Sequence, residues 1–458
     1  MSTHPASEVG ASIGTASLLG IRRGLRAVLV VVAAVVLTAS LLTSRQDAPL
    51  LAVASGFMLL IGLAVVPLRS RAPGINALDP FLAVGLLFGA VIPIMNVIAG
   101  PPRVGIRSAA SAQAAIQVQT IALVFFAAVL VGWSLWRSSE KERQSIAWPR
   151  RRYALLLVLL GTAGLLIRAV VGAERVGSLV GLTSTLVTPL LAIGTFLVLA
   201  QTRVGPRLLL AVLLVPASFM GLATYSLNRA IFVVPVAAMV IVLVRAGRIR
   251  RVVRVGVLLL GVAVAFFVLI GLVRVENLRE EFGDNVQRQS ATELASTSLQ
   301  VYGQSPYMTG SSLDSPYEAS FGGDSFVASA LAPIPALGDG YRSYTGTRLF
   351  NQQLGRGDAS DQIVPLWLEA FLSGGLWLTL AVALVAGVLL KWCDEVMRTS
   401  GHVMAVYLAA FVSLWLAQSM IVSLLVLAQV TYYFVLPVLA VSRFGRAGAP
   451  PEVKCASG

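Results

Sequence analysis

The stretch VPLWLEAFLSGGLWLTLAVALVAGVLL, residues 364–390, decides the class of fold. Glu369 is its one ionisable side chain, and the stretch exceeds the roughly 20 apolar residues that cross a bilayer. The whole chain has the same character, because 57% of its 458 residues are hydrophobic and only 12% are charged. Soluble domains carry about 25% charged residues, so a mean hydropathy of +0.83 predicts an integral membrane protein.

Apolar stretches near the spanning length recur on both sides of this segment and predict about twelve transmembrane helices in an all-α polytopic fold. We expect them at residues 25–43, 50–68, 78–99, 113–136, 153–173, 180–200, 207–226, 230–245, 253–273, 366–391, 402–422 and 424–442. The last two spans are almost contiguous, which leaves a tight hairpin and a broken helix both open. The predicted organisation is a cytoplasmic tail (1–24), helices within 25–273, a loop (274–365), helices within 366–442 and a cytoplasmic tail (443–458).

Lysine and arginine cluster in alternate short connections, such as those around Arg151, Arg248 and Arg398. The positive-inside rule makes these connections and both termini cytoplasmic, and places the loop 274–365 outside. The net charge of +14 therefore sets orientation, and we expect no nucleic-acid partner. Cys393 and Cys455 fall on the reducing side, where no disulfide is expected.

The loop 274–365 is rich in Gly, Ser, Pro and Tyr, for example YGQSPYMTGSSLDSPYEASFGGDS. Its charged beginning, RVENLREEFGDNVQRQ, is compatible with helix, so we expect a large, partly helical extracytoplasmic loop. Loops of this length are generally functional.

Four arginines are expected at the outer ends of helices: Arg168, Arg175, Arg229 and Arg274. An arginine at membrane depth costs at least about 2.5–3.5 kcal/mol and needs a compensating partner. One interpretation is that each side chain extends to the outer headgroups. The other is that the guanidinium groups together bind a lipid-linked pyrophosphate.

A second group runs from the end of the loop into the next helix: Arg342, Arg348, Arg356, Asp358, Asp361 and Glu369. Glu369 stands in the apolar run PLWLEAFLSGGLWL, where a carboxylate is expensive unless it is paired or used. It is a candidate general base, or it forms a structural Glu–Arg pair that fixes the loop to the bundle.

Several motifs are absent from the sequence. There is no GxxxxGK[ST] phosphate loop, no Asp-x-Asp element and no His/Cys metal-ligand cluster, so we expect neither ATP-driven transport nor a metal or other cofactor. A glycosyl donor whose leaving group is a lipid pyrophosphate fits these absences.

The segments SLNRAIFVVPVAAMVIVLV (226–244) and SDQIVPLWLEAFLSGGLWLTLAVALVAGVLL (360–390), with the long loop between them, resemble the bacterial O-antigen (Wzy-type) repeat-unit polymerases. Pro365, Glu369, Gly374 and Gly375 stand in the family's pattern of a proline, a glutamate and a glycine-rich turn. The Arg-x10-Gly motifs of some members are not matched at Arg168 or Arg175.

The resemblance implies a metal-independent glycosyltransferase of the membrane-embedded C type in the bacterial cytoplasmic membrane. It would join undecaprenyl-pyrophosphate-linked oligosaccharides on the outer face, with a flippase and a chain-length regulator as partners. Arg168, Arg175, Arg229 and Arg274 would hold the pyrophosphate, assisted by Arg342 and Arg348. Glu369 or Asp361 would accept the proton of the attacking hydroxyl, and the loop would cap the site.

Three alternatives stay open. An O-antigen ligase shares donor and fold, although His402 lies on the cytoplasmic side of the predicted topology and cannot be an external ligase-type histidine. A twelve-helix secondary transporter or flippase usually has two similar halves and polar residues near the midplane. The third alternative is a scaffold whose loop binds cell-wall components.

Overall fold

The computed structural model describes residues 55–56, 58–62, 75–94, 112–135, 144–171, 186–187, 189–201, 230–247, 320–334, 337–353 and 364–444. Throughout these ranges the chain forms helices and their connections, with one isolated β-bridge between Ala147 and His402. The predicted all-α class is confirmed for this part of the chain. The expected helices at 25–43, 207–226 and 253–273 lie outside the described residues.

Four helices in the described ranges are long and apolar enough to cross a membrane. They run over Gln117–Leu135, Leu366–Thr399, Val403–Met420 and Leu424–Ser442, and shorter apolar helices cover Leu78–Ile94 and Pro189–Val198. These helices support membrane embedding, and the total of about twelve spans stays a prediction.

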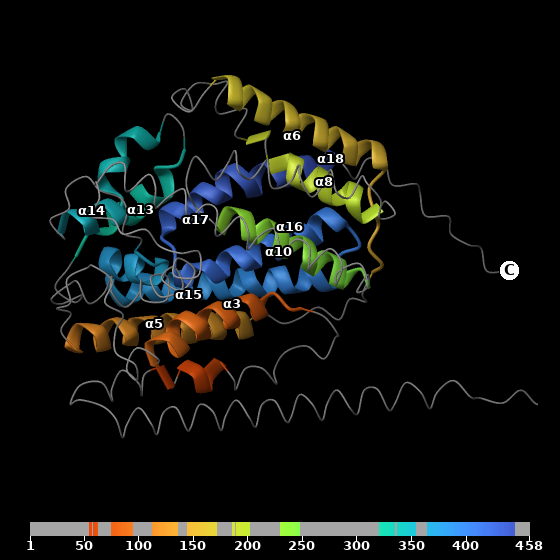
Figure 1. The fold of residues 1–458 in the computed structure, drawn as a ribbon. Coiled ribbons are helices and arrows are strands. Elements are labelled where there is room, and N and C mark those ends of the chain that lie inside the picture. Colours follow the sequence, from red (N-terminus) through yellow and green to blue (C-terminus); the bar gives the residue numbers. More distant parts are fainter. Residues whose placement is uncertain are drawn as a thin grey trace, which may run out of the picture.

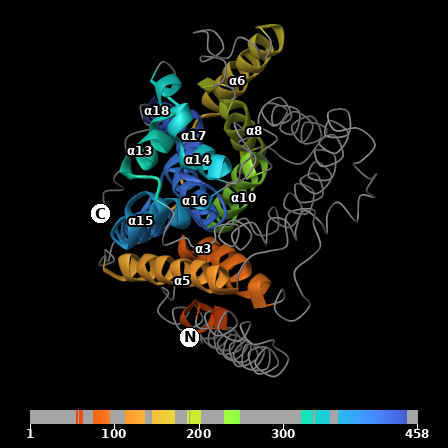
Figure 2. The same cartoon turned by 90° about the vertical axis from the view of Figure 1, so that its left-hand side faces the viewer.

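The helices pack in layers around α15 (Leu366–Thr399) and α16 (Val403–Ala417) (Figures 1 and 2). On one side lie α5 (Ala112–Leu135) against α15 and α3 (Leu78–Leu86) against α16; α3 continues into a π-helical turn, η2 (Leu87–Val91). On the other side α10 (Ala230–Arg245) packs on α16, with α8 (Pro189–Gln201) and α6 (Arg151–Val171) beyond it.

Glycines bring α5 and α15 together. A Cβ on Gly387 would lie 2.7 Å from the backbone nitrogen of Trp133, and a Cβ on Gly132 would collide with the backbone of Leu384. Only hydrogen fits at either position, so the two backbones approach as small residues allow in membrane helix pairs. This contact fixes α15 against the bundle.

The predicted span 366–391 differs from the observed helix in two ways. The helix extends to Thr399, because no helix-breaking residue intervenes before Ser400 and Gly401. It is also interrupted at Gly374 (φ −150°, ψ 20°) and Gly375 (φ 65°, ψ −159°). The interruption separates a buried half-helix, residues 366–373, from the longer part that follows.

The last two spans form a tight hairpin rather than one broken helix. α16 continues through a 3-10 turn, η7 (Gln418–Met420), and α17 (Leu424–Val430) begins after three connecting residues. A second π-helical turn, η8 (Thr431–Val435), leads into α18 (Leu436–Phe444). The Trp415 indole donates to the Leu427 carbonyl at 3.2 Å, and the rings of Phe411 and Phe434 stack at 6.0 Å, as an antiparallel pair requires.

Three connections meet at one end of the bundle, which we call the charged end: residues 144–150, 245–247 and 398–402. Arg245 donates to the carbonyls of Met397 and Arg398, both at 2.6 Å, and to that of Gln144 at 3.2 Å. Cations favour the carboxyl end of a helix, so Arg245 caps α15. The charge pattern predicts that these three connections share the cytoplasmic side, and they do share one end of the bundle.

Candidate functional site

The described residues of the predicted loop, 320–334 and 337–353, form a cap at the opposite end of the bundle (Figure 1). The cap contains α13 (Gly323–Leu331), two 3-10 turns, η5 (Gly338–Gly340) and η6 (Arg342–Tyr344), and α14 (Gly346–Gln353). These described residues are partly helical. The charged beginning of the loop, where helix was predicted, lies outside the described residues, and the extracytoplasmic placement of the loop stays a prediction.

Helix α13 lies antiparallel to the half-helix 366–373. The hydroxyls of Ser325 and Ser373 are 2.7 Å apart, and one turn further along the Ser329 hydroxyl donates to Glu369 Oε1. The Phe321 amide donates to the Leu372 carbonyl at 2.8 Å. Small hydroxyl side chains that bond across closely packed helices are typical of membrane interiors.

Glu369 is fully buried, and both of its carboxylate oxygens accept hydrogen bonds. Oε1 accepts from the Ser329 hydroxyl, and Oε2 accepts from the Leu424 amide at 2.7 Å. The Gly346 amide in turn donates to Ser329 Oγ at 2.9 Å. One carboxylate therefore joins α13, α14 and α17.

The residue types around Glu369 determine what the carboxylate can do. Leu424 is the first residue of α17, so the anion lies at a helix N-terminus, where the helix dipole favours negative charge. The structural interpretation predicted an arginine partner, whereas the described groups that bond Glu369 are the Ser329 hydroxyl and the backbone amides of Leu424 and Gly346. A buried carboxylate stabilised by neutral donors can act as an acceptor for a hydroxyl proton.

Two predicted arginines belong to the cap. Arg342 is exposed on η6 and interacts electrostatically with Tyr433, whose hydroxyl donates to the Pro333 carbonyl at 2.8 Å. Arg348 lies half-buried on α14, two residues after Gly346. The structure thus brings Arg342, Arg348 and Glu369 into one region.

Of the remaining predicted site residues, one falls within a described helix. Arg168 lies near the end of α6, in the outermost layer of the bundle, and its side chain is outside the described ones (Figures 1 and 2). Arg175, Arg229, Arg274 and Asp361 fall outside the described residues. Their roles in pyrophosphate binding and proton transfer stay predictions.

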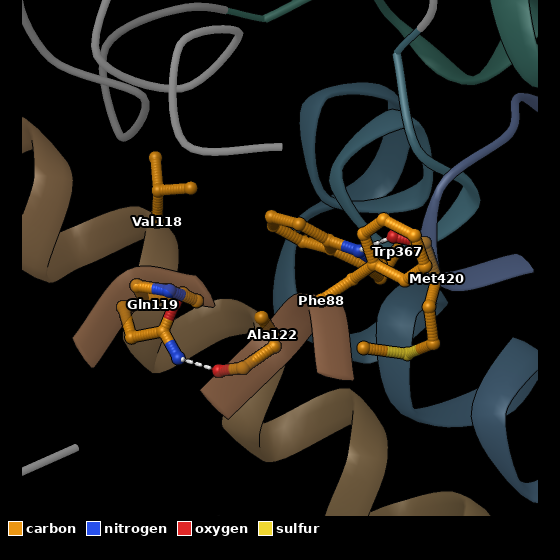
Figure 3. Close-up of a pocket in the computed structure, with 8 residues that line it drawn as sticks. Phe88, Val118, Gln119, Ala122, Trp367 and Met420 are labelled. Carbon is orange, nitrogen blue, oxygen red and sulfur yellow. Dashed lines mark hydrogen bonds between the residues drawn. The ribbon is translucent and has the colours of Figure 1, made fainter. Parts of the chain in front are cut away.

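Behind the half-helix a small pocket separates it from α5 and η2 (Figure 3). Trp367 forms one wall and donates through its indole nitrogen to the Met420 carbonyl at 3.2 Å. On the facing wall the Gln119 amide donates to the Gly89 carbonyl, within the π-helical turn. The remaining lining residues are Phe88, Pro93, Val118 and Ala122. The pocket is mainly apolar and adjoins the helix that carries Glu369.

Four residues near Glu369 were not predicted from the sequence: Ser325, Ser329, Gly346 and Leu424. A signal was present for the serines, because Ser325 and Ser329 are four residues apart, as are Glu369 and Ser373. Two such pairs can meet along two antiparallel helices. No comparable signal exists for Leu424, which contributes only a backbone amide.

Among the described residues, no group of three or more His, Cys, Asp or Glu side chains is placed to hold a metal ion. Comparison of the chain with protein-family models, curated proteins and solved structures finds no significant match.

Proposed function

We propose that the protein is a membrane glycosyltransferase that polymerises oligosaccharides linked to undecaprenyl pyrophosphate. The observation that carries this proposal is the burial of Glu369 between the cap and the membrane bundle. A lipid-linked sugar has its isoprenoid chain in the bilayer and its glycan in water, so its reactive carbon lies at such a boundary. The resemblance of residues 360–390 to Wzy-type polymerases supports the same assignment.

In the proposed reaction, a hydroxyl of the acceptor glycan attacks the anomeric carbon of the donor glycan. A new carbon–oxygen bond forms as the bond to the pyrophosphate breaks, and the hydroxyl proton passes to Glu369. The lipid pyrophosphate leaves with the electron pair, and arginines stabilise its charge. The cap has to shift from Glu369 to admit the acceptor, because the Ser329 hydroxyl of the cap bonds carboxylate oxygen Oε1 in this conformation.

The test uses cells in which the gene is deleted and replaced by variants, with surface glycan length read on a gel. Glu369→Gln removes the proton acceptor and should leave single repeat units, since general base catalysis contributes about 10²–10⁴-fold. Glu395→Gln, the same change at the charged end of α15, should leave the ladder intact. Arg229→Ala tests the predicted pyrophosphate site.

Ser329→Ala distinguishes a catalytic role of Glu369 from a structural one. The variant removes a hydrogen bond to the carboxylate but no proton acceptor. If Glu369 is catalytic, Ser329→Ala should therefore lower thermal stability and keep polymerisation. If both variants lost polymer only in proportion to the amount of folded protein, Glu369 would be a structural latch. A normal ladder with folded Glu369→Gln would overturn the proposal.

One observation favours a secondary transporter as the second candidate. α15 is discontinuous at Gly374 and Gly375, and its half-helix carries a buried ionisable residue. Transporters bind substrates with discontinuous helices of this kind. Deletion of a transporter or flippase should leave lipid-linked units on the inner face, whereas deletion of a polymerase should leave single units at the cell surface.

A further inference from the structure

The cap presents two aromatic side chains to solvent in a single turn. Tyr341 is 38% exposed and Tyr344 is 59% exposed. The Tyr344 amide donates to the Tyr341 carbonyl at 3.0 Å, which closes a 3-10 turn. Residues three apart in a 3-10 helix lie on one face, so the two side chains share a side of the turn. Arg342 and Ser343, between them, are also exposed.

This turn lies close to Glu369 in space, because it directly precedes Gly346. Gly346 follows Tyr344 by two residues, and its amide donates to the serine hydroxyl that bonds the carboxylate. A Cβ on Gly346 would lie 2.6 Å from Glu369 Oε1. Because two peptide units span at most about 7.6 Å, the distance from the Tyr344 backbone to the carboxylate is about the length of one or two sugar rings.

The residue types in the turn suit a sugar. An aromatic ring has a negative face, which attracts the weakly positive C–H groups on the apolar side of a pyranose. The tyrosine hydroxyls, the Ser343 hydroxyl and the Arg342 guanidinium can bond sugar hydroxyls around such a stacked ring. Tyrosine also loses little conformational entropy on binding, which makes an exposed pair an efficient contact surface.

We propose that Tyr341 and Tyr344, with Arg342 and Ser343, form a glycan-binding strip that holds the acceptor chain over the cap. The strip rests on the proposed function, since it would direct an acceptor hydroxyl toward Glu369. It adds a substrate-binding surface of stated chemistry: neutral or acidic pyranose residues stacked on two tyrosine rings.

Binding is measured with the full-length protein in lipid nanodiscs. The probe is the oligosaccharide released by mild acid from the lipid-linked fraction of the same cells. Tyr341→Ala with Tyr344→Ala should weaken binding about tenfold, which corresponds to about 1.4 kcal/mol, because both stacking rings are lost. The matched variant, Tyr341→Phe with Tyr344→Phe, keeps both rings and should bind within about threefold of the parent. In cells the alanine variant should give shorter polymers.

The outcomes separate this strip from the proposed catalysis. Unchanged affinity in the folded alanine variant would overturn the strip, even if Glu369→Gln abolished polymerisation. Ring-dependent binding together with normal polymer from Glu369→Gln would keep the strip and reject the catalytic role of Glu369. A nitroxide label can also be attached to Tyr344→Cys. If oxygen relaxed this label more strongly than a water-soluble nickel complex did, the turn would lie in lipid, and this result would also overturn the strip.

Discussion

Glu369 shows why one buried carboxylate needs specific neighbours. Both oxygens act as acceptors, from Ser329 and from the Leu424 amide, so a glutamine would turn its NH2 group toward one of these donors. The glycine at position 346 gives the carboxylate its space, because an added Cβ would lie 2.6 Å from Oε1 and 2.8 Å from Cγ of Glu369.

Gly346→Ala should therefore displace the carboxylate and destabilise the cap. We expect a loss of about 1–3 kcal/mol, the usual cost of overpacking a well-filled site, measured as a lower thermal midpoint in detergent. Gly340→Ala is the matched control, because a Cβ there meets nothing within 4 Å. Equal midpoints for the two variants would show that the contact with Glu369 is loose.

At this scale the sequence could indicate Glu369 but not its environment. A single carboxylate in residues 364–390 is conspicuous because charge in an apolar run is costly. Its partners come from residues 329, 346 and 424, and no local pattern specifies which distant backbone amide will face a side chain. The arginines expected near it were grouped by topology alone, which cannot determine which helices are neighbours.

Among the elements, α15 departs most from expectation. Hydropathy treats residues 366–391 as one span, since Gly374 and Gly375 are apolar enough to continue it. The backbone at Gly375, with φ 65° and ψ −159°, belongs to a region that essentially only glycine occupies. The break directs the half-helix toward α13 and brings Glu369 to the cap rather than to lipid.

Gly375→Ala should weaken this break at a cost of about 1–3 kcal/mol. A Cβ at Gly375 meets nothing within 4 Å, so the expected loss is one of backbone strain and not of packing. Gly323→Ala, at the first position of α13 and equally unobstructed, should be neutral or slightly stabilising through helix propensity. Thermal midpoints and glycan ladders should differ between the two variants. Identical results for Gly375→Ala and Gly323→Ala would contradict a strained backbone at Gly375.

For the whole molecule, hydropathy and charge together predict the end-to-end arrangement. Apolar runs give the helices, and alternating clusters of Lys and Arg assign connections to two sides. The described connections at 144–150, 245–247 and 398–402 do meet at one end, with the cap at the other. The lateral order of the helices was not predictable from the sequence. It depends on close helix contacts such as those at Gly132 and Gly387, and the sequence does not distinguish the small residues that make such contacts from those that do not.

Two exposed tryptophans on α15 predict how the bundle sits in a bilayer. Trp377 is 82% exposed and Trp392 is 44% exposed, and tryptophan prefers the headgroup level. At 1.5 Å per residue they are separated by about 22 Å, most of the ~30 Å hydrocarbon thickness. Val385, 59% exposed between them, should then lie near the midplane.

Nitroxide labels on single cysteines at 377, 385 and 392, with Cys393→Ala and Cys455→Ser as background, test this placement in vesicles. Relaxation by oxygen relative to a water-soluble nickel complex should be greatest at 385 and lower at both tryptophan positions. A label on His402→Cys, exposed at the charged end, should be the most accessible to nickel and should be reduced by ascorbate from the cytoplasmic side only. If position 385 were as accessible to nickel as 377, this face of α15 would not meet lipid, and the half-helix with Glu369 would not lie at a membrane boundary.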